Sequence, residues 1–324
     1  RIGVFACLIW YLIDKDKNIL KLFYYTLVLC FSILVVDGYF QFFFGINTIG
    51  LPTNGTRISS FFGDELIMGS FLARLFPLLF ALFLLQDKKK FEIYFIGILF
   101  ILVDVLIYIS GERTAFFFLN LFNFFIFFLI KEHRKFRIIT FVCALILISV
   151  LSLSSNEISN RMIMSPIKSM GFDQRDKDKK IFTPYHDSHI KTAINMFLDK
   201  PVLGHGPKMF RIICKEKKYQ VGITPCENHP HNFYVQLLAE TGIIGFTFLL
   251  SAFIYVIYVS YRQLKTILLK QEKRYLTDYQ VCLLAGILIT LWPLAPNGNF
   301  FNNWLAITYS LPVGFYLQSI YEKN

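Results

Sequence analysis

Apolar residues in this chain are gathered into long runs that short polar segments separate. Most of the runs approach the length of about 20 residues that a helix needs to cross the hydrocarbon core of a bilayer. Because that core contains no water, each run must satisfy its own backbone hydrogen bonds and is expected to be helical. The expected spans are residues 2–13, 19–43, 66–85, 93–109, 115–130, 138–153, 233–261, 281–294 and 304–321.

This spacing predicts an all-α fold, a polytopic transmembrane helical bundle of about nine spans. We expect residues 1–153 to form N-terminal transmembrane helices, residues 154–232 a long loop with amphipathic helices, and residues 233–324 C-terminal transmembrane helices. The first run is short and starts at the first residue, so we expect the sequence to be N-terminally truncated. A soluble protein is the alternative, but buried helices are typically shorter than these runs.

Composition agrees with a membrane protein, and charge indicates its orientation. The chain is 55% hydrophobic and contains 37 Phe, which is oilier than a typical soluble domain. Its net charge is +11, and much of this charge lies in short loops, where Lys and Arg mark the cytoplasmic side. The basic loops contain Lys15, Lys17, Lys21, Lys88, Lys89, Lys90, Lys131, Arg134, Lys135, Arg137, Arg262, Lys265, Lys270, Lys273 and Arg274. The loop at residues 154–232 is then extracytoplasmic, and no nucleic-acid-binding motif is found.

A polar stretch at residues 199–245 carries the candidate catalytic group. In its segment H-P-H-N, Pro230 disfavours helical backbone in the preceding residue, so the next helix begins only near Asn232. Asn is a favoured N-cap residue. His231 is then expected at the outer membrane boundary, where an imidazole that titrates near neutrality can act as a general base. The alternative is that His229, His231 and Asn232 only cap the helix.

Three arginines are candidates for binding phosphate. Arg113 lies in the turn S-G-E-R-T-A, Arg211 lies in the polar stretch, and Arg74 lies inside an apolar run. A guanidinium in or near a membrane is costly unless it is paired, and its planar donors suit phosphate oxygens. Several arginines at one membrane face would bind a lipid diphosphate and stabilise a leaving pyrophosphate. The alternative is an ion pair with Glu112 or Glu65 that only holds the loops.

Other polar residues of this region are expected to support the site. Glu240 lies inside an apolar run, where an ionisable group faces the protein interior and either takes part in catalysis or bonds a helix end. Gly242 and Gly245 allow a neighbouring segment to approach closely. His189 belongs to an amphipathic helix at residues 188–199 that is expected along the membrane surface, and it faces either the site or solvent. The apolar face of that helix contains Ile190, Ile194, Phe197 and Leu198.

The cysteines indicate an oxidising environment for the long loop. Cys214 and Cys226 lie outside the apolar runs, twelve positions apart. A disulfide between them requires an extracytoplasmic compartment and would stabilise the loop by about 3 kcal/mol. The alternatives are two reduced thiols or a metal site shared with His229 and His231. The order C-x11-C-x2-H-x-H does not match common structural zinc sites, so we expect no metal.

These motifs together resemble those of the O-antigen ligase and polymerase family of Gram-negative bacteria. The segment D-K-P-V-L-G-H-G-P-K-M-F, the segment H-P-H-N-F-Y-V-Q-L-L-A-E-T-G-I-I-G, the turn S-G-E-R-T-A and the segment P-N-G-N-F-F-N-N-W are all similar to the family's. The family pattern of His, Asn, nine residues and Gly-x-x-Gly is matched by His231, Asn232, Gly242 and Gly245. The resemblance covers about residue 54 to the C-terminus. Some members carry an Arg near the position of His189.

The resemblance implies a metal-independent, inverting glycosyltransferase of the bacterial inner membrane whose active site faces the periplasm. Its donor would be a glycan on undecaprenyl diphosphate, and no cofactor would be needed because the lipid diphosphate is itself the activated leaving group. Arg113 and Arg211 would hold the diphosphate, and His231 would deprotonate or orient the acceptor hydroxyl. The acceptor would be a lipid A-core sugar in a ligase, or another lipid-linked repeat unit in a polymerase.

A ligase is the expected function, and a polymerase is the alternative within the same family. A polysaccharide or solute transporter is the alternative from another class. Transporters are commonly built from repeats with interrupted helices near the bilayer midplane, and the sequence shows neither feature. Its polar residues gather instead at the expected outer face, where an enzyme with an extracytoplasmic acceptor needs them.

Overall fold

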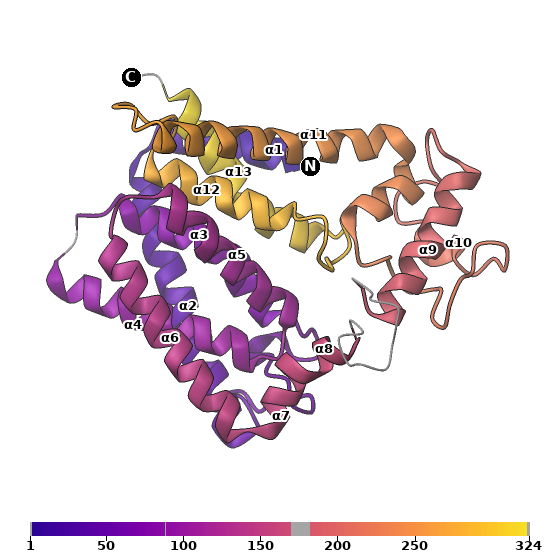
Figure 1. Ribbon diagram of the computed structural model, residues 1–324, viewed down its shortest axis with the longest axis horizontal. Helices are drawn as coiled ribbons and strands as arrows, with labels where there is room; N and C mark the ends of the chain where they lie inside the picture. The colour runs from indigo at the N-terminus through magenta and orange to yellow at the C-terminus, as the bar shows by residue number, and fades with distance from the viewer. Residues whose placement is uncertain (1, 88, 170–181, 323–324) are drawn as a thin grey trace. The chain divides into compact units, whose positions relative to one another are not determined.

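The computed structural model describes residues 2–87, 89–169 and 182–322, which form helices joined by turns and loops (Figure 1). These residues contain no β-strand, and their two isolated bridges pair Ile46 with Pro52 and Asn54 with Arg57. The predicted all-α fold is therefore confirmed for the described part of the chain. Residues 170–181 of the predicted long loop lie outside it.

The chain divides into two compact units. The first comprises Arg1–Met164, Ser260–Thr290 and Ser310–Asn324, and the second comprises Ser165–Val259 and Leu291–Tyr309. These units do not coincide with the predicted order of N-terminal helices, long loop and C-terminal helices, because two C-terminal helices each contribute to both units. The predicted three-part organisation stays a prediction.

The helices follow the apolar runs closely. The first unit contains α1 (Ile2–Lys15), α2 (Asn18–Phe44), the 3₁₀-helix η1 (Ser60–Phe62), α3 (Met68–Leu84), α4 (Lys90–Ile109), α5 (Arg113–Leu129), α6 (Arg134–Ser154), α7 (Asn156–Ser159), the π-helix η2 (Asn160–Met164) and α12 (Asp278–Thr290). The second unit contains α8 (Ser165–Ser169), α9 (Pro184–Asp199) and α10 (Phe210–Ile213). The helices α11 (Phe233–Leu268) and α13 (Asn303–Tyr321) belong partly to each unit.

Four helices among the described residues, α2, α4, α6 and α11, are long and apolar enough to cross a membrane. The helices α3, α5 and α12 are apolar but shorter. On α6, Ile139 is 60% exposed and Leu153 is 87% exposed. Such a row of unpacked apolar side chains is compatible with hydrocarbon rather than water around the helix. The chain is an integral membrane protein, while the count of nine spans stays a prediction.

Two polar side chains of α2 hold the loop that connects α2 to α3. Asp37 is buried and accepts hydrogen bonds from the Thr48 amide, at 2.9 Å, and from the Ser60 hydroxyl. One turn later, the side-chain oxygen of Gln41 accepts from the amides of Ser59, at 3.0 Å, and Ser60, at 2.7 Å. Because buried carboxylate and amide groups need partners, these bonds give the loop a defined course.

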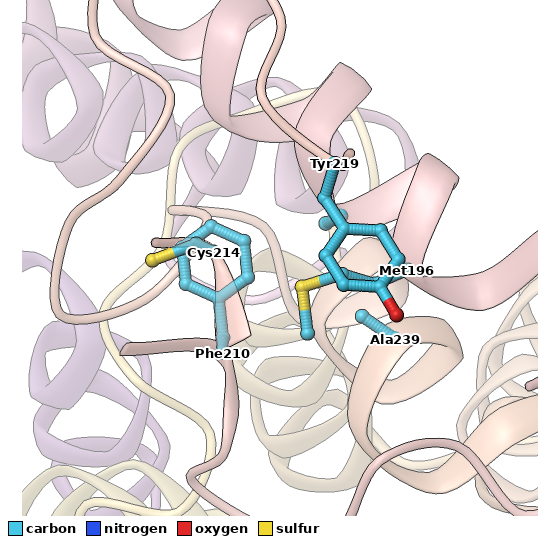
Figure 2. Packing of buried hydrophobic residues seen from close by; sticks show 6 residues of the cluster. Met196, Phe210, Cys214, Tyr219 and Ala239 are labelled. Carbon is cyan, nitrogen blue, oxygen red and sulfur yellow. The ribbon is translucent and has the colours of Figure 1, made fainter. Parts of the chain in front are cut away.

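The second unit has its own small apolar core, shown in Figure 2. The side chains of Met196, Phe210, Tyr219 and Ala239 pack together there with Cys214. They come from α9, α10, the turn after α10 and the first part of α11. This core joins the segments on which most of the candidate site residues lie.

The structure locates the packed face of α9 on a different side from the predicted apolar stripe. Thr183 caps the helix, which begins at Pro184, four residues earlier than predicted. The buried positions are Ser188, His189, Thr192, Ala193 and Met196. Of the predicted stripe, Ile194 and Leu198 are exposed. The helix carries apolar residues on two sides, so periodicity alone did not identify the side that packs. Contact of the outer stripe with the membrane surface stays a prediction.

Candidate active site

His231 stands immediately before the N-terminus of α11, in a backbone conformation that few residues adopt. Its φ angle is 54°, in the left-handed region that is uncommon for residues other than Gly. Asn232 follows as the N-cap, and its side-chain oxygen accepts hydrogen bonds from the amides of Tyr234, at 3.0 Å, and Val235, at 3.1 Å. The predicted cap is therefore confirmed, and it orients the residue that precedes it.

The loop between α12 and α13 holds the same segment from the other side. The Asn297 amide donates to the carbonyl of His231 at 2.8 Å. The side-chain amide of Asn232 donates to the carbonyl of Pro293, also at 2.8 Å. Both partners lie in or near the segment P-N-G-N-F-F-N-N-W, so this segment positions the backbone of His231.

Three other imidazoles gather around His231. Its ring centroid lies 4.1 Å from that of His229, 5.4 Å from that of His186 and 5.6 Å from that of His189. His189, whose exposure the sequence left open, is 4% exposed and faces this cluster. His186 is a member that the sequence analysis did not single out. Its spacing of three positions from His189 would have placed both on one face of a helix.

The cluster keeps its imidazoles neutral. Burial, and after it the nearby rings of His229, His186 and His189, lower the pKa of His231 to about 3. Burial likewise lowers the pKa of His229 to about 4. The pKa values of His186 and His189 are also lowered, chiefly by burial. At neutral pH each ring therefore has an unprotonated nitrogen that can accept a proton or a hydrogen bond.

Glu240 bonds the turn that precedes α10. It is 1% exposed, and its carboxylate accepts hydrogen bonds from the amides of Lys208, at 3.0 Å, and Phe210, at 2.8 Å. Gln236 donates to the same carboxylate at 3.1 Å and to the side-chain oxygen of Asn299 at 2.8 Å. Of the two roles that the sequence left open for Glu240, these contacts describe the structural one, a bond to a helix end.

Arg211 lies on α10, directly after the turn that Glu240 bonds. It is exposed, and no described side chain forms a hydrogen bond or an ion pair with its guanidinium. The positive charge of Arg211 acts on both His229 and Glu240. The structure thus brings one of the predicted phosphate-binding arginines close to the histidine cluster.

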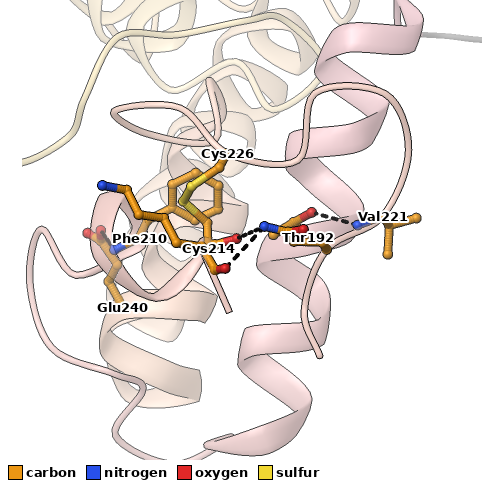
Figure 3. The surroundings of a disulfide bond; sticks show 8 residues. Thr192, Phe210, Cys214, Val221, Cys226 and Glu240 are labelled. Atoms are coloured by element: carbon orange, nitrogen blue, oxygen red, sulfur yellow. Dashed lines mark hydrogen bonds between the residues drawn. A yellow bond between two sulfur atoms is a disulfide. The ribbon is translucent and has the colours of Figure 1, made fainter. Parts of the chain in front are cut away.

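A disulfide joins Cys214 at the end of α10 to Cys226, three residues before His229 (Figure 3). The Cα atoms of the two cysteines are 5.2 Å apart. Beside the bond, the Val221 amide donates to the hydroxyl of Thr192 at 3.2 Å, which ties the same loop to α9. These links hold the turn with Arg211 and the segment with the histidines in one framework. With both sulfurs in the bond, the alternative metal site has lost its thiolate ligands.

A second group of charged residues surrounds the turn between α4 and α5 in the first unit. Nε of Arg113 donates to the carbonyl of Arg161 at 2.8 Å, and Nε of Arg161 donates to the carbonyl of Gly111 at 3.0 Å. Arg57 is close enough for its charge to interact with Arg113, Arg161 and Glu112. Three guanidinium groups thus share one region with the carboxylate of Glu112, and an excess of positive charge attracts anions.

Glu112 holds the start of α3. Its carboxylate accepts hydrogen bonds from the amides of Gly69, at 2.6 Å, and Ser70, at 3.0 Å, and from the Ser70 hydroxyl at 2.7 Å. Backbone amides at a helix N-terminus are favourable partners for a carboxylate. The sequence analysis did not identify Arg57 or Arg161 as members of this group. Both residues are far from Arg113 along the chain, so no sequence pattern indicated that they approach it.

Arg74 has a different environment from the other predicted phosphate-binding residues. It is 3% exposed on α3, and its guanidinium carbon lies 4.6 Å from the centroid of the Phe118 ring. A cation over an aromatic face is an established stabilising contact. This packing favours a structural role for Arg74 within the first unit.

A family model described as O-antigen ligase matches residues 96–250. The matched region contains Arg113, Arg161, Arg211, all four clustered histidines and Glu240, whereas Arg57 and Arg74 precede it. A search of curated proteins finds no match.

Proposed function

We propose that this chain, whose residues 96–250 match a family model described as O-antigen ligase, transfers a glycan from undecaprenyl diphosphate to a sugar hydroxyl of lipid A-core. The match and the apolar helices support a membrane-bound glycosyltransferase of the O-antigen ligase or polymerase type. The proposal adds the donor, the acceptor and the side of the membrane, which is the periplasmic face of the inner membrane. The observation that carries it is the half-buried, neutral His231, with the exposed Arg211 near its neighbour His229.

The proposed reaction is a single displacement at the first carbon of the donor glycan. The acceptor hydroxyl attacks that carbon while its proton passes to the imidazole of His231, which acts as general base. The bond between the carbon and the diphosphate oxygen breaks, and undecaprenyl diphosphate leaves with the bonding electron pair. The new glycosidic bond has inverted configuration, and the imidazolium returns its proton to solvent. A general base of this kind accelerates a reaction typically by about 10²–10⁴-fold.

Arginines are proposed to bind the phosphate oxygens of the donor. Arg211 in the second unit has an exposed guanidinium without a bonded side chain among the described residues. Arg113 in the first unit belongs with Arg57 and Arg161 to a group of three cations. Guanidinium groups form short, charge-assisted bonds with phosphate and stabilise charge that develops on a leaving group. In this proposal they take the part that a metal ion plays in other phosphate sites.

The experiment is transfer by the purified protein in nanodiscs, with an undecaprenyl-diphosphate glycan as donor and lipid A-core as acceptor. We expect transfer without ATP and in the presence of a chelator, and a loss of about 100-fold or more in His231→Ala. His133→Gln, which changes a histidine of the first unit, is the matched control and should retain activity. Normal transfer by His231→Ala would reject the assigned base.

The products of this assay also separate the two reactions that the family carries out. A ligase forms lipid A-core that carries the glycan, whereas a polymerase forms ladders of repeat units that remain on the lipid carrier. Uptake into sealed vesicles without a new glycosidic bond would reject both and favour a transporter.

A further inference from the structure

Two members of the histidine cluster each have one nitrogen bonded and one nitrogen bare. The ring of His189 hydrogen-bonds the backbone of Pro225, and the ring of His229 hydrogen-bonds the backbone of Asn297. Nδ1 of His189 and Nε2 of His229 are buried and have no hydrogen-bond partner among the described residues. The bonds to the backbone are therefore made by the opposite nitrogens, Nε2 of His189 and Nδ1 of His229.

These bonds decide which nitrogen of each ring carries the proton. Each bond raises the pKa of its imidazole, so the backbone carbonyl is the acceptor and the ring N–H is the donor. In a neutral imidazole the other nitrogen then presents only a lone pair. Nδ1 of His189 and Nε2 of His229 are thus two buried acceptors that need O–H or N–H donors.

Both acceptors belong to rings next to the proposed catalytic base. The ring centroids of His189 and His229 lie 5.6 Å and 4.1 Å from that of His231. His186 is equally close to His231, at 5.4 Å, but its Nδ1 is bonded to the hydroxyl of Thr183 at 2.8 Å. His189 and His229 therefore differ from His186 in having a buried ring nitrogen that no described residue bonds.

A sugar suits these acceptors better than a metal ion does. Adjacent hydroxyl groups of a sugar ring are small O–H donors, and a neutral site holds them without a counter-charge. Among the described residues, no group of three or more His, Cys, Asp or Glu is arranged to hold a metal ion. An anionic phosphate has no proton to donate at neutral pH when it is fully ionised, so it does not fit two lone pairs.

We propose that Nδ1 of His189 and Nε2 of His229 accept hydrogen bonds from hydroxyl groups of the acceptor sugar. The two histidines then form the subsite that selects this sugar and places its reacting hydroxyl against His231. The inference rests on the proposed transfer function and adds a specificity role to it. It also assigns a ligand class, a sugar with free neighbouring hydroxyls, to residues that otherwise only surround the base.

The kinetic test uses the intact protein in nanodiscs and compares His189→Phe, His229→Phe and the control His133→Phe, which changes a histidine outside the cluster. Phe keeps the flat ring and removes the acceptor nitrogen. We expect the KM for lipid A-core to rise about tenfold in the first two variants, with the donor KM unchanged. In His133→Phe the acceptor KM should stay within about twofold of the wild type. His189→Gln, which restores an acceptor, should recover part of the loss. An unchanged acceptor KM in His189→Phe and His229→Phe would overturn the proposal.

A binding test separates this subsite from the transfer reaction. The probes are the methyl glycosides of glucose, galactose and N-acetylglucosamine and their monodeoxy analogues, followed by saturation-transfer NMR. Binding by the wild type that is weaker for one deoxy analogue and absent in His189→Phe and His229→Phe supports the subsite even if no transfer occurs. Equal binding by wild type and variants overturns it, as does a cluster that retains stoichiometric zinc through purification and loses it with a chelator. Where a variant fails to fold, the histidine ¹⁵N resonances of the wild type are followed instead. A shift on addition of a glycoside supports the subsite, and no shift overturns it.

Discussion

At the scale of the residue, the main feature is a half-buried imidazole among other imidazoles. Removal from water, and then the three neighbouring rings, lower the proton affinity of His231. A base with a pKa of about 3 is present in its active form at any physiological pH, but its proton affinity is small. An anionic diphosphate bound nearby would raise that pKa towards neutrality, where a base is most effective.

The lowered pKa values predict that acid destabilises the folded protein. Unfolded histidines have a pKa of about 6.5, whereas those of His229 and His231 in the folded state are about 4 and about 3. Below pH 6.5 the unfolded chain therefore binds protons that the folded chain does not, so the free energy of unfolding decreases from pH 6.5 towards pH 4. Thermal unfolding in detergent should show a lower midpoint at pH 5 than at pH 7. The double variant His229→Gln, His231→Gln should show a smaller decrease, and an equal decrease would contradict the role of these histidines.

Sequence reasoning recovered the residues of the site that lie close together along the chain. His229, His231, Asn232 and the two disulfide cysteines fall within a short polar stretch, so their proximity needed no tertiary information. His186 and Arg161 were missed because each is far in sequence from the residue that it approaches. The position of α9 brings His186 to His231, and the position of η2 brings Arg161 to the turn at Gly111.

At the scale of the element, the break in α11 shapes the second unit. Gly242 interrupts the helix with a φ angle of 63°. A Cβ at this position would overlap the carbonyl of Val202, and the Ile243 amide donates to the carbonyl of Pro201 at 2.8 Å. The loop before α10 therefore packs directly on the backbone of the break. The glycine is needed both for its conformation and for its lack of a side chain.

The same contacts predict unequal effects for the two glycines of the family pattern. Gly242→Ala should destabilise the protein by about 1–3 kcal/mol, because it adds backbone strain and pushes the loop of Val202 away. Gly245→Ala is the comparison, since Gly245 has no positive φ angle and the nearest atoms to its Cβ belong to the side chain of Thr241, not to the backbone of another segment. Thermal unfolding of both purified variants measures the difference. A larger loss in Gly245→Ala than in Gly242→Ala would show that the break does not depend on Gly242.

At the scale of the whole molecule, the bilayer acts as the solvent for much of the chain. Many apolar side chains on the outside of α2 and α6 are exposed and are more stable in hydrocarbon than in water. The basic loops are expected to mark the cytoplasmic ends of the helices. On this reasoning we propose that the loop with the disulfide and the histidines faces the periplasm.

The orientation is tested by labelling single cysteines in intact cells. Cys7, Cys30, Cys143 and Cys282 are replaced by Ala, the disulfide is kept, and either Lys217→Cys or Lys135→Cys is added. Both added positions are exposed. A membrane-impermeant maleimide should label the cysteine at position 217 in spheroplasts and the one at position 135 only after the membrane is permeabilised. The reverse pattern would contradict the proposed periplasmic site.

The sequence by itself determined the helical, membrane-embedded class, the approximate positions of the helices and the resemblance to O-antigen ligases, because these depend on local composition and on short motifs. The length of an apolar run predicts the length of a helix, and a Pro, an Asn or a Gly predicts where the helix begins or ends. Tertiary structure decided which face of α9 packs, which histidines join His231, and that Glu240 and Glu112 hold helix starts. Those outcomes depend on contacts between segments distant in the chain, where burial and the pairing of polar groups select one arrangement among several that the sequence pattern allows.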